Sequence, residues 1–202
     1  MAITINGSTN TLTGVAVGGL PNGIVDNDMI ANSTIAEAKL AANVNTITMV
    51  DQWRLTSGLA LNSISGDHIT LASNLERVDS VGQTTLNGGM THSSGIWTFP
   101  ETGIYKVEYF MMASSSTATT YVDVATLYDF DGDGSFDQVS RILQNTNASS
   151  YCNGYMSTII DVDNTSNCKL LFRARSQNTG TQLTGSSALN YNCMTFTRLG
   201  DT

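Results

Sequence analysis

Short runs of alternating apolar and polar residues, separated by turn-forming residues, fill the chain from residue 46 to its C-terminus. In the run 104–112, four residues are available to a core: Ile104, Val107, Tyr109 and Met111. Further runs span residues 47–55, 95–99, 119–128, 139–143, 151–162, 168–175 and 190–199. Successive side chains of a strand point to opposite faces, so such runs at fairly regular spacing indicate a β-sandwich or barrel. Because no helical pattern follows residue 45, the sequence predicts an all-β, antiparallel sandwich over residues 46–202.

The composition excludes several classes of function. Charged residues make up 13% of the chain, about half of the ~25% usual for globular proteins, and Ser, Thr, Asn and Gly take up the difference. The net charge is −8, and the nine Lys and Arg residues are scattered along the sequence. Nucleic acids and anionic membranes both attract clustered basic residues, so we expect neither as a partner. No apolar run approaches the ~20 residues of a membrane span.

The N-terminal sequence and the cysteines indicate where the chain is made. The first residues show neither the basic nor the apolar segment of a secretory signal, so we expect synthesis in a reducing cytoplasm. The three cysteines are far apart in the sequence and odd in number. We therefore expect small buried side chains rather than a disulfide framework.

Residues 1–45 are expected to form a separate N-terminal arm. Glycines interrupt its two weak strand signals, at residues 3–6 and 12–15. A helix of about two turns could follow, capped by Ser33 or Thr34, but such a helix is too short to be stable alone. The arm should therefore be extended, contain at most this helix, and dock onto a partner. The predicted anchoring residues are Leu20, Ile24, Ile30, Ile35 and Leu40.

The segment 97–107, Trp-Thr-Phe-Pro-Glu-Thr-Gly-Ile-Tyr-Lys-Val, carries a family resemblance. Together with residues 53–55, 74–79 and 89–96, it resembles the complement C1q/tumour-necrosis-factor-like jelly roll, and more narrowly the version in structural proteins of tailed phages. Pro100 and Gly103 supply the turn of this motif, because neither residue suits a central strand. Residues 194–200 resemble the last strand of the family, which lies centrally in its sheet. Residues 19–40 are similar to connector segments of phage fibres and capsid-associated proteins.

The resemblance also implies a homotrimer. A well-packed interface favours aromatic side chains, and the head contains more tyrosines than we can place in one core. The tyrosines predicted at the trimer interface are Tyr105, Tyr109, Tyr121, Tyr155 and Tyr191. Tyr151 belongs to the same unplaced group without being assigned to the interface. The alternative for each tyrosine is an ordinary position in the core or on an exposed strand.

The segment 129–137, Asp-Phe-Asp-Gly-Asp-Gly-Ser-Phe-Asp, is a candidate calcium loop. Ca²⁺ takes six to eight oxygen ligands, and alternating carboxylates can wrap a loop around one ion. The predicted ligands are Asp129, Asp131, Asp133, Ser135 and Asp137. The pattern resembles the calcium loops of integrin-type β-propeller repeats, whereas Ser140 stands where an EF-hand has its bidentate glutamate. The alternative is a solvated acidic hairpin tip.

Catalysis has little support in the sequence. His68 and His92 belong to no recognisable triad, and we expect both at the surface or in turns. Two carboxylate pairs could be proposed for glycoside hydrolysis, but any β-protein offers such pairs. They are Glu76 with Asp79 and Glu101 with Glu108. We therefore expect no enzyme, and no cofactor other than calcium.

These observations favour a structural protein of a phage virion, made in the cytoplasm of the host bacterium. In one version the arm binds the major capsid protein, and the trimer is a capsid decoration (cement) protein or head fibre. In another, the arm joins a tail protein, and the head is a receptor-binding tip that adsorbs to the host, for example to a surface glycan. The short arm, which has no shaft, favours the first version. A further alternative is a free carbohydrate-binding lectin module, which predicts that Trp53 or Trp97 is exposed in a groove.

Overall fold

The structure is a computed structural model that describes residues 4–6, 8, 11–13, 47–61, 67–87 and 89–202. Contacts divide the chain into two units, Met1–Val44 and Asn45–Thr202. In the first unit, β1 (Thr4–Asn6) and β2 (Thr11–Thr13) pair antiparallel, where the weak strand signals stand. The predicted short helix lies outside the described residues, as do the predicted anchoring residues Leu20, Ile24, Ile30, Ile35 and Leu40.

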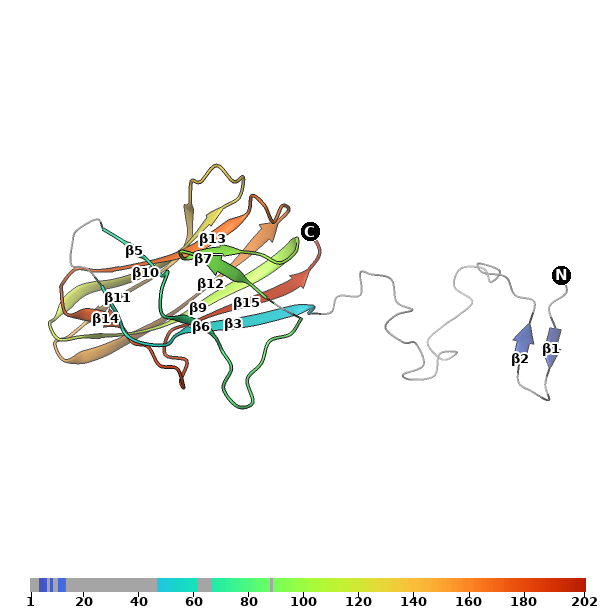
Figure 1. The fold of residues 1–202 in the computed structure, drawn as a ribbon, viewed down its shortest axis with the longest axis horizontal. Coiled ribbons are helices and arrows are strands. Elements are labelled where there is room, and N and C mark those ends of the chain that lie inside the picture. Colours follow the sequence, from blue (N-terminus) through green and yellow to red (C-terminus); the bar gives the residue numbers. More distant parts are fainter. Residues whose placement is uncertain (1–3, 7, 9–10, 14–46, 62–66, 88) are drawn as a thin grey trace. The chain divides into compact units, whose positions relative to one another are not determined.

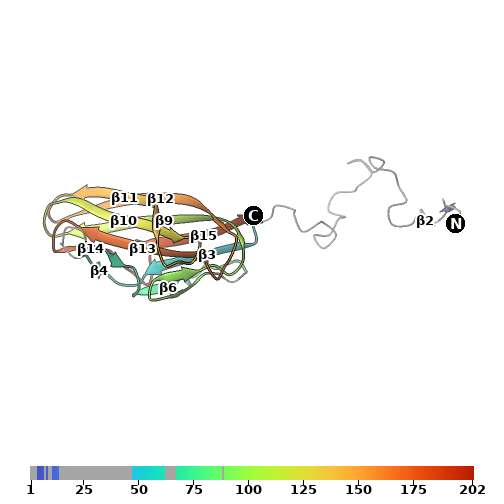
Figure 2. The same cartoon turned by 90° about the horizontal axis from the view of Figure 1, so that it is seen from above.

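The second unit, which we call the head, consists of two antiparallel β-sheets whose long strands run alongside one another (Figures 1 and 2). The six-stranded sheet has the order β11-β10-β13-β8-β7, with β5 also paired to β13. Its strands are β5 (Ile69–Thr70), β7 (Thr91–Ser93), β8 (Ile96–Thr98), β10 (Thr119–Asp129), β11 (Asp137–Thr146) and β13 (Lys169–Ser176).

The seven-stranded sheet has the order β4-β14-β9-β15-β3-β6. Strands β14 and β15 pair with successive parts of one edge of β9, and β12 pairs with the opposite edge. Its strands are β3 (Met49–Leu55), β4 (Leu59–Ala60), β6 (Leu75–Arg77), β9 (Gly103–Ser115), β12 (Ser150–Val162), β14 (Thr181–Leu183) and β15 (Cys193–Gly200). The last strand, β15, lies between β3 and β9, so the expectation of a central last strand is confirmed.

The prediction of an all-β, antiparallel sandwich is confirmed. Every alternating run of the sequence overlaps one of the observed strands, and the described residues contain no helix. The strands that were not predicted, β4, β5, β6, β7 and β14, have only two or three residues each, which is too short to show a period. The described residues accordingly include no helix that could cross a membrane.

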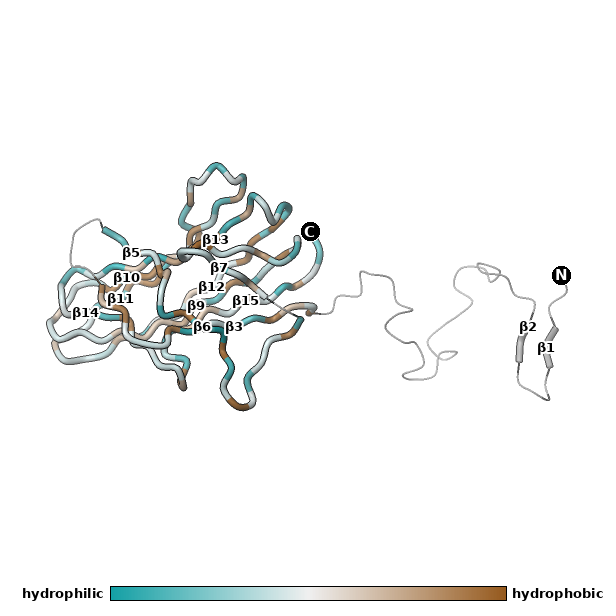
Figure 3. The backbone as a smooth tube through the Cα atoms, in the orientation of Figure 1, coloured by the Kyte–Doolittle hydropathy of each residue, from teal (hydrophilic) through white to brown (hydrophobic). Residues whose placement is uncertain are grey.

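The hydrophobic core lies between the two sheets, and apolar and polar residues alternate along the strands that enclose it (Figure 3). The ring of Trp97 on β8 lies 5.1 Å from that of Phe196 on β15, so these aromatic side chains join the sheets. On β9 the inward side chains include Tyr105, Val107 and Tyr109. The prediction that Ile104 belongs to the core is wrong: it lies on the opposite face of the strand, since its position differs in parity from those residues.

Candidate functional sites

The outward face of the seven-stranded sheet carries a group of exposed apolar side chains. On β12, Tyr151, Tyr155 and Ile159 point away from the core and are 65%, 58% and 66% exposed. On the neighbouring strand β9, Phe110 stands opposite Tyr155 and is 39% exposed. Residues four apart in a strand share one side, so the three β12 residues form one row. We call Phe110, Tyr151, Tyr155 and Ile159 the apolar face.

A charged group borders the apolar face. Lys106 Nζ lies 2.7 Å from Oε1 of Glu108, and the Tyr155 hydroxyl donates a hydrogen bond to the same carboxylate. Burial raises the pKa of Glu108, but the hydrogen bonds from Lys106 and Tyr155 outweigh it, and the net effect is a lowered pKa. Glu108 therefore stays ionised at neutral pH and holds the Tyr155 ring in place on the sheet.

Two of the predicted interface tyrosines lie in the core instead. Neither Tyr105 nor Tyr109 has any exposed surface. Their hydroxyls donate hydrogen bonds to the carbonyl oxygen of Glu101 at 2.9 Å and to Oδ1 of Asn192 at 3.1 Å, respectively. Burial, followed by the nearby charge of Glu101, raises the pKa of Tyr105 to about 12. Side chains enclosed by their own chain cannot touch a partner, so we remove both from the predicted interface.

The other three predicted tyrosines do not share one surface. Tyr155 belongs to the apolar face, whereas Tyr121 lies half-buried on β10 of the other sheet, with the Arg175 guanidinium 5.4 Å from its ring. Tyr191 is half-buried in the segment before β15. Phe110 and Ile159, which also lie on the apolar face, were not among the predicted residues. The sequence indicates part of this grouping, because Ile159 follows Tyr155 by four residues on a predicted strand and therefore lies on the same face.

The acidic segment forms the loop between β10 and β11, and it brings three carboxylates together. Oxygen atoms of Asp129, Asp131 and Asp133 all lie within 4.8 Å of one another. Ca²⁺ binds oxygen at 2.3–2.6 Å, so ligand atoms at this separation could surround one ion. Among the described residues, Asp137 is not part of this group, because it begins β11 opposite Tyr128. The predicted calcium site is thus narrowed to three carboxylates, and calcium binding itself stays a prediction.

Asp129 also shapes this loop through the backbone. Its side chain is buried, and its two oxygens accept hydrogen bonds from the N–H groups of Gly132 at 2.8 Å and Gly134 at 3.0 Å. Both glycines have positive φ angles, of +80° and +85°, which glycine adopts without strain. The Ser135 N–H donates to Asp133 at 2.7 Å. The carboxylates therefore have a structural role in the loop whether or not they bind a cation.

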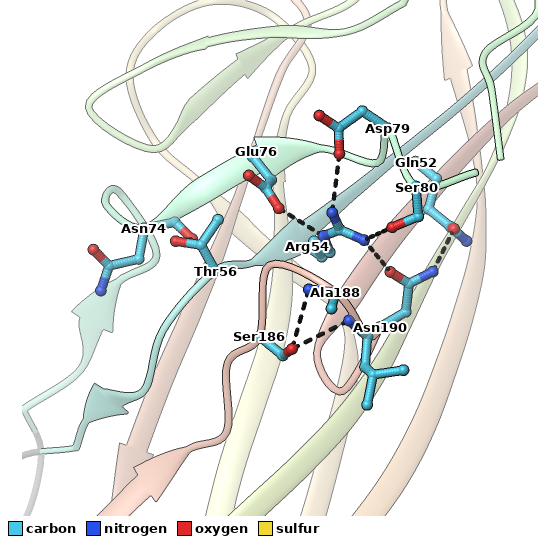
Figure 4. A network of polar contacts seen from close by, with 11 residues as sticks. Gln52, Arg54, Thr56, Asn74, Glu76, Asp79, Ser80, Ser186, Ala188 and Asn190 are labelled. Atoms are coloured by element: carbon cyan, nitrogen blue, oxygen red, sulfur yellow. Dashed lines mark hydrogen bonds and ion pairs between the residues drawn. The ribbon is translucent and has the colours of Figure 1, made fainter.

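The buried arginine Arg54, near the end of β3, binds residues of β6 and of two loop segments through its guanidinium group (Figure 4). Arg54 is 1% exposed and donates to Glu76 at 2.7 Å, to Asp79 at 3.0 Å and to Ser80 Oγ at 2.8 Å. It also contacts Asn190 Oδ1 at 3.5 Å. Glu76 and Asp79, one of the two carboxylate pairs considered for glycoside hydrolysis, are thus ion-pair partners of this arginine.

A second buried polar group, Asp51, lies three residues before Arg54 on β3. Asp51 has no exposed surface, and it accepts hydrogen bonds from Arg77 Nε at 2.8 Å, Trp53 Nε1 at 2.9 Å and the Met90 N–H at 2.8 Å. A buried carboxylate is tolerated only when it is paired in this way. Asp51 therefore holds β6 and the start of the β7 segment against the sheet.

The two tryptophans form no exposed groove. Trp97 is fully buried, and Trp53 is half-buried, with the Arg77 guanidinium 4.8 Å from its ring. His92 packs against both rings, with centroid distances of 5.2 Å to Trp53 and 4.7 Å to Trp97. Burial lowers the pKa of His92. The lectin alternative thereby loses the binding site that it predicted, and His92 is a packing residue rather than a surface one.

The comparisons with known proteins address the fold. No family model matches the chain, and the curated proteins contain no significant match. Among solved structures, murine APRIL is 13% identical, with 75% of this chain and 98% of that chain covered and a TM-score of 0.53. Eiger TNF from S. frugiperda is 10% identical, with 78% and 96% covered and a TM-score of 0.56. The fold is a tumour-necrosis-factor-like jelly roll.

The jelly-roll part of the predicted resemblance is therefore confirmed. At these identities the likeness concerns the fold and says nothing of partners or activity. PRD1 vertex protein P5 is also similar, with 14% identity, 77% of this chain and 99% of that chain covered, and a TM-score of 0.47. That score is too low to support an inference, so the phage-specific part of the resemblance stays a prediction.

Proposed function

We propose that this chain forms a homotrimer on the surface of a phage virion, as a capsid decoration protein or head fibre held by its N-terminal arm. The observation that carries the trimer is the apolar face. Its four large side chains lie together on one sheet, in a chain rich in Ser, Thr, Asn and Gly. Monomeric proteins rarely expose contiguous apolar patches without an interaction that covers them.

The energetics favour covering this face. Fully burying a large apolar side chain contributes about 1.5–3 kcal/mol, so four such residues per chain offer a substantial driving force for association. The face also includes β12, whose second edge has no partner strand among the described residues. An exposed edge strand invites uncontrolled pairing, and a closed symmetric assembly would shield it on every copy. The resemblance of residues 97–107 makes three the expected number of copies.

The virion assignment rests on the narrower resemblance of residues 97–107 and on the similarity of residues 19–40 to connector segments. A jelly-roll head with an arm that cannot form its own core suits a protein that docks onto a larger particle. The net charge of −8 favours solubility of the exposed head. No step of this proposal requires catalysis.

Two measurements test the proposal. Sedimentation equilibrium of the whole chain should give a mass three times its 21.5 kDa, and a monomer at micromolar concentration would overturn the trimer. Quantitative mass spectrometry of purified particles should find the chain in an amount comparable to the major capsid protein. A copy number far below that would identify a tail component instead, and absence from the particle would overturn the virion assignment.

A further inference from the structure

Three of the nine Lys and Arg residues gather on the outer face of the six-stranded sheet. Arg141 lies on β11, and Arg173 and Arg175 lie on β13. The strand register places Ala125 of β10 between Arg141 and Arg173, and Asp123 opposite Arg175. Neighbouring strands are about 4.8 Å apart, so the three arginines occupy one small area, which we call the arginine cluster. The sequence gives no sign of it, because the residues lie up to 34 positions apart, as their numbers show.

One buried carboxylate holds two members of the cluster. Asp123 is 1% exposed, and it accepts hydrogen bonds from Arg141 Nε at 2.9 Å and Nη2 at 2.7 Å, and from Arg175 Nε at 2.9 Å. His68 Nε2 lies 3.8 Å from the same carboxylate. Three arginines against one aspartate leave an excess of positive charge here, in a chain whose net charge is −8. The excess is fixed in place, because Asp123 orients both guanidinium groups.

Arg173 is the member of the cluster that has no hydrogen-bond or ion-pair partner among the described residues. Within the part of the chain that the structure describes, no carboxylate or carbonyl oxygen accepts a hydrogen bond from its guanidinium, and its Nε is buried without an acceptor. Buried N–H groups are nearly always paired, and an unpaired one is energetically unfavourable. The residue as a whole is half-buried, so part of its side chain remains accessible to a ligand.

We propose that the arginine cluster binds an oxyanion: a carboxylate, sulfate or phosphate group. Arg173 is the principal donor, and Arg141 and Arg175 are flanking charges that Asp123 holds in position. A guanidinium presents N–H groups in a planar fork that matches two oxygens of such a group, which suits it better than a lysine ammonium. The cluster and the apolar face lie on different sheets, so this inference does not depend on the trimer.

A free inorganic anion and an acidic saccharide both offer this chemistry, and titration can separate them. The Nε–Hε resonances of the arginines would be followed by NMR on the whole chain, during addition of sodium sulfate, sodium phosphate or sodium glucuronate. Sodium chloride at equal ionic strength is the reference. We expect saturable shifts of the Arg173 resonance and of the flanking Arg141 and Arg175 resonances with at least one oxyanion, and only small, linear changes with chloride. A response to glucuronate alone would identify a carboxylate of the saccharide type, whereas equal responses to sulfate and phosphate would identify a general oxyanion site.

Variants decide whether the cluster is responsible. Arg173→Gln should abolish the saturable shifts of Arg141 and Arg175, while Arg173→Lys should retain binding at about tenfold higher ligand concentration, because the charge remains and the fork is lost. Lys106→Gln removes one positive charge from the other sheet and should bind like the parent. The proposal is overturned if no oxyanion shifts the resonances beyond the chloride reference, or if Arg173→Gln binds as tightly as the parent. If Arg173→Gln does not fold, Arg173→Lys is the deciding variant, and binding as tight as that of the parent would overturn the proposal.

Discussion

Tyr155 on β12 and Phe110 on β9 stand directly opposite each other on the outward face of the seven-stranded sheet, and both side chains are exposed. Facing cross-strand residues have Cβ atoms roughly 5 Å apart, so the two rings form one apolar surface. Tyr151 and Ile159 extend this surface along β12. This surface is the one that we propose for contact with a second chain.

Replacing Tyr155 and Ile159 together by serine should dissociate the trimer while the head stays folded, because neither side chain belongs to the core. Full burial of an exposed side chain contributes about 1.5–3 kcal/mol, and Tyr155 and Ile159 are 58% and 66% exposed, so the double substitution should weaken association by roughly 20- to 500-fold. Sedimentation velocity measures the change. Leu143→Ser removes a side chain of similar exposure from the other sheet and should leave the trimer intact. If the double variant assembles as tightly as the parent, the apolar face is not the interface.

Calcium at millimolar concentration should raise the melting temperature of the head, since binding to the folded state alone stabilises it. The double variant Asp131→Asn with Asp133→Asn should lose this effect, because both exposed carboxylates belong to the candidate site. Differential scanning calorimetry with calcium or with a chelator measures the shift. Equal melting temperatures of the parent in the two solutions would remove the calcium prediction.

Asp129→Ala should destabilise the head even in the presence of a chelator. The substitution removes the hydrogen bonds that Asp129 accepts from the N–H groups of Gly132 and Gly134. These glycines are exposed and water can replace the acceptor, so each lost bond should cost about 0.5–1.5 kcal/mol. Urea unfolding in chelator measures the loss. The exposed Asp131→Ala is the matched control and should change the free energy of unfolding by less than about 0.5 kcal/mol.

Gly103→Ala should be among the most damaging glycine substitutions of the head. Gly103 has a φ of +140°, and an added Cβ would lie 2.5 Å from the Gly200 carbonyl oxygen. Backbone strain and overpacking together should cost roughly 2–5 kcal/mol. Gly82→Ala is the control, because Gly82 also has a positive φ, of +83°, but nothing lies within 4 Å of its added Cβ. Urea unfolding should show a loss of only about 1 kcal/mol there, and equal losses in the two variants would contradict the steric argument.

His92 should make the head less stable in mild acid. Burial lowers its folded-state pKa below the ordinary 6.5, so on acidification the unfolded chain takes up a proton before the folded chain does. This effect is absent above about pH 7.5, where the histidine is neutral in both states, and it grows as the pH falls through the unfolded-state pKa of 6.5 toward the lower folded-state pKa. His92→Gln should therefore flatten the loss of unfolding free energy between about pH 7.5 and 5.5. The same slope in parent and variant would contradict it.

Alternation along single strands sufficed to predict much of the fold. The inward row of Val107, Tyr109 and Met111 could be recognised because a strand repeats every two residues, and Pro100 with Gly103 could be recognised as a turn. The same period could not say which face of each strand lies against the second sheet. Residue type does not separate Tyr105 and Tyr109 from Tyr155, because all three carry the same ring and hydroxyl group. The second sheet covers one face of β9 and buries Tyr105 and Tyr109, whereas Tyr155 stays exposed.

The sequence by itself determined the all-β class and the acidic loop between two strands, because each follows from residues close together in the chain. Only the tertiary structure decided what lies on each face. It brought Phe110 to Tyr155 and Arg173 to Arg141 through pairing of strands far apart in sequence, and it separated Tyr121 from Tyr155 onto different sheets. Register and sheet order arise from long-range packing of a shared core, and no local pattern of residues contains that information.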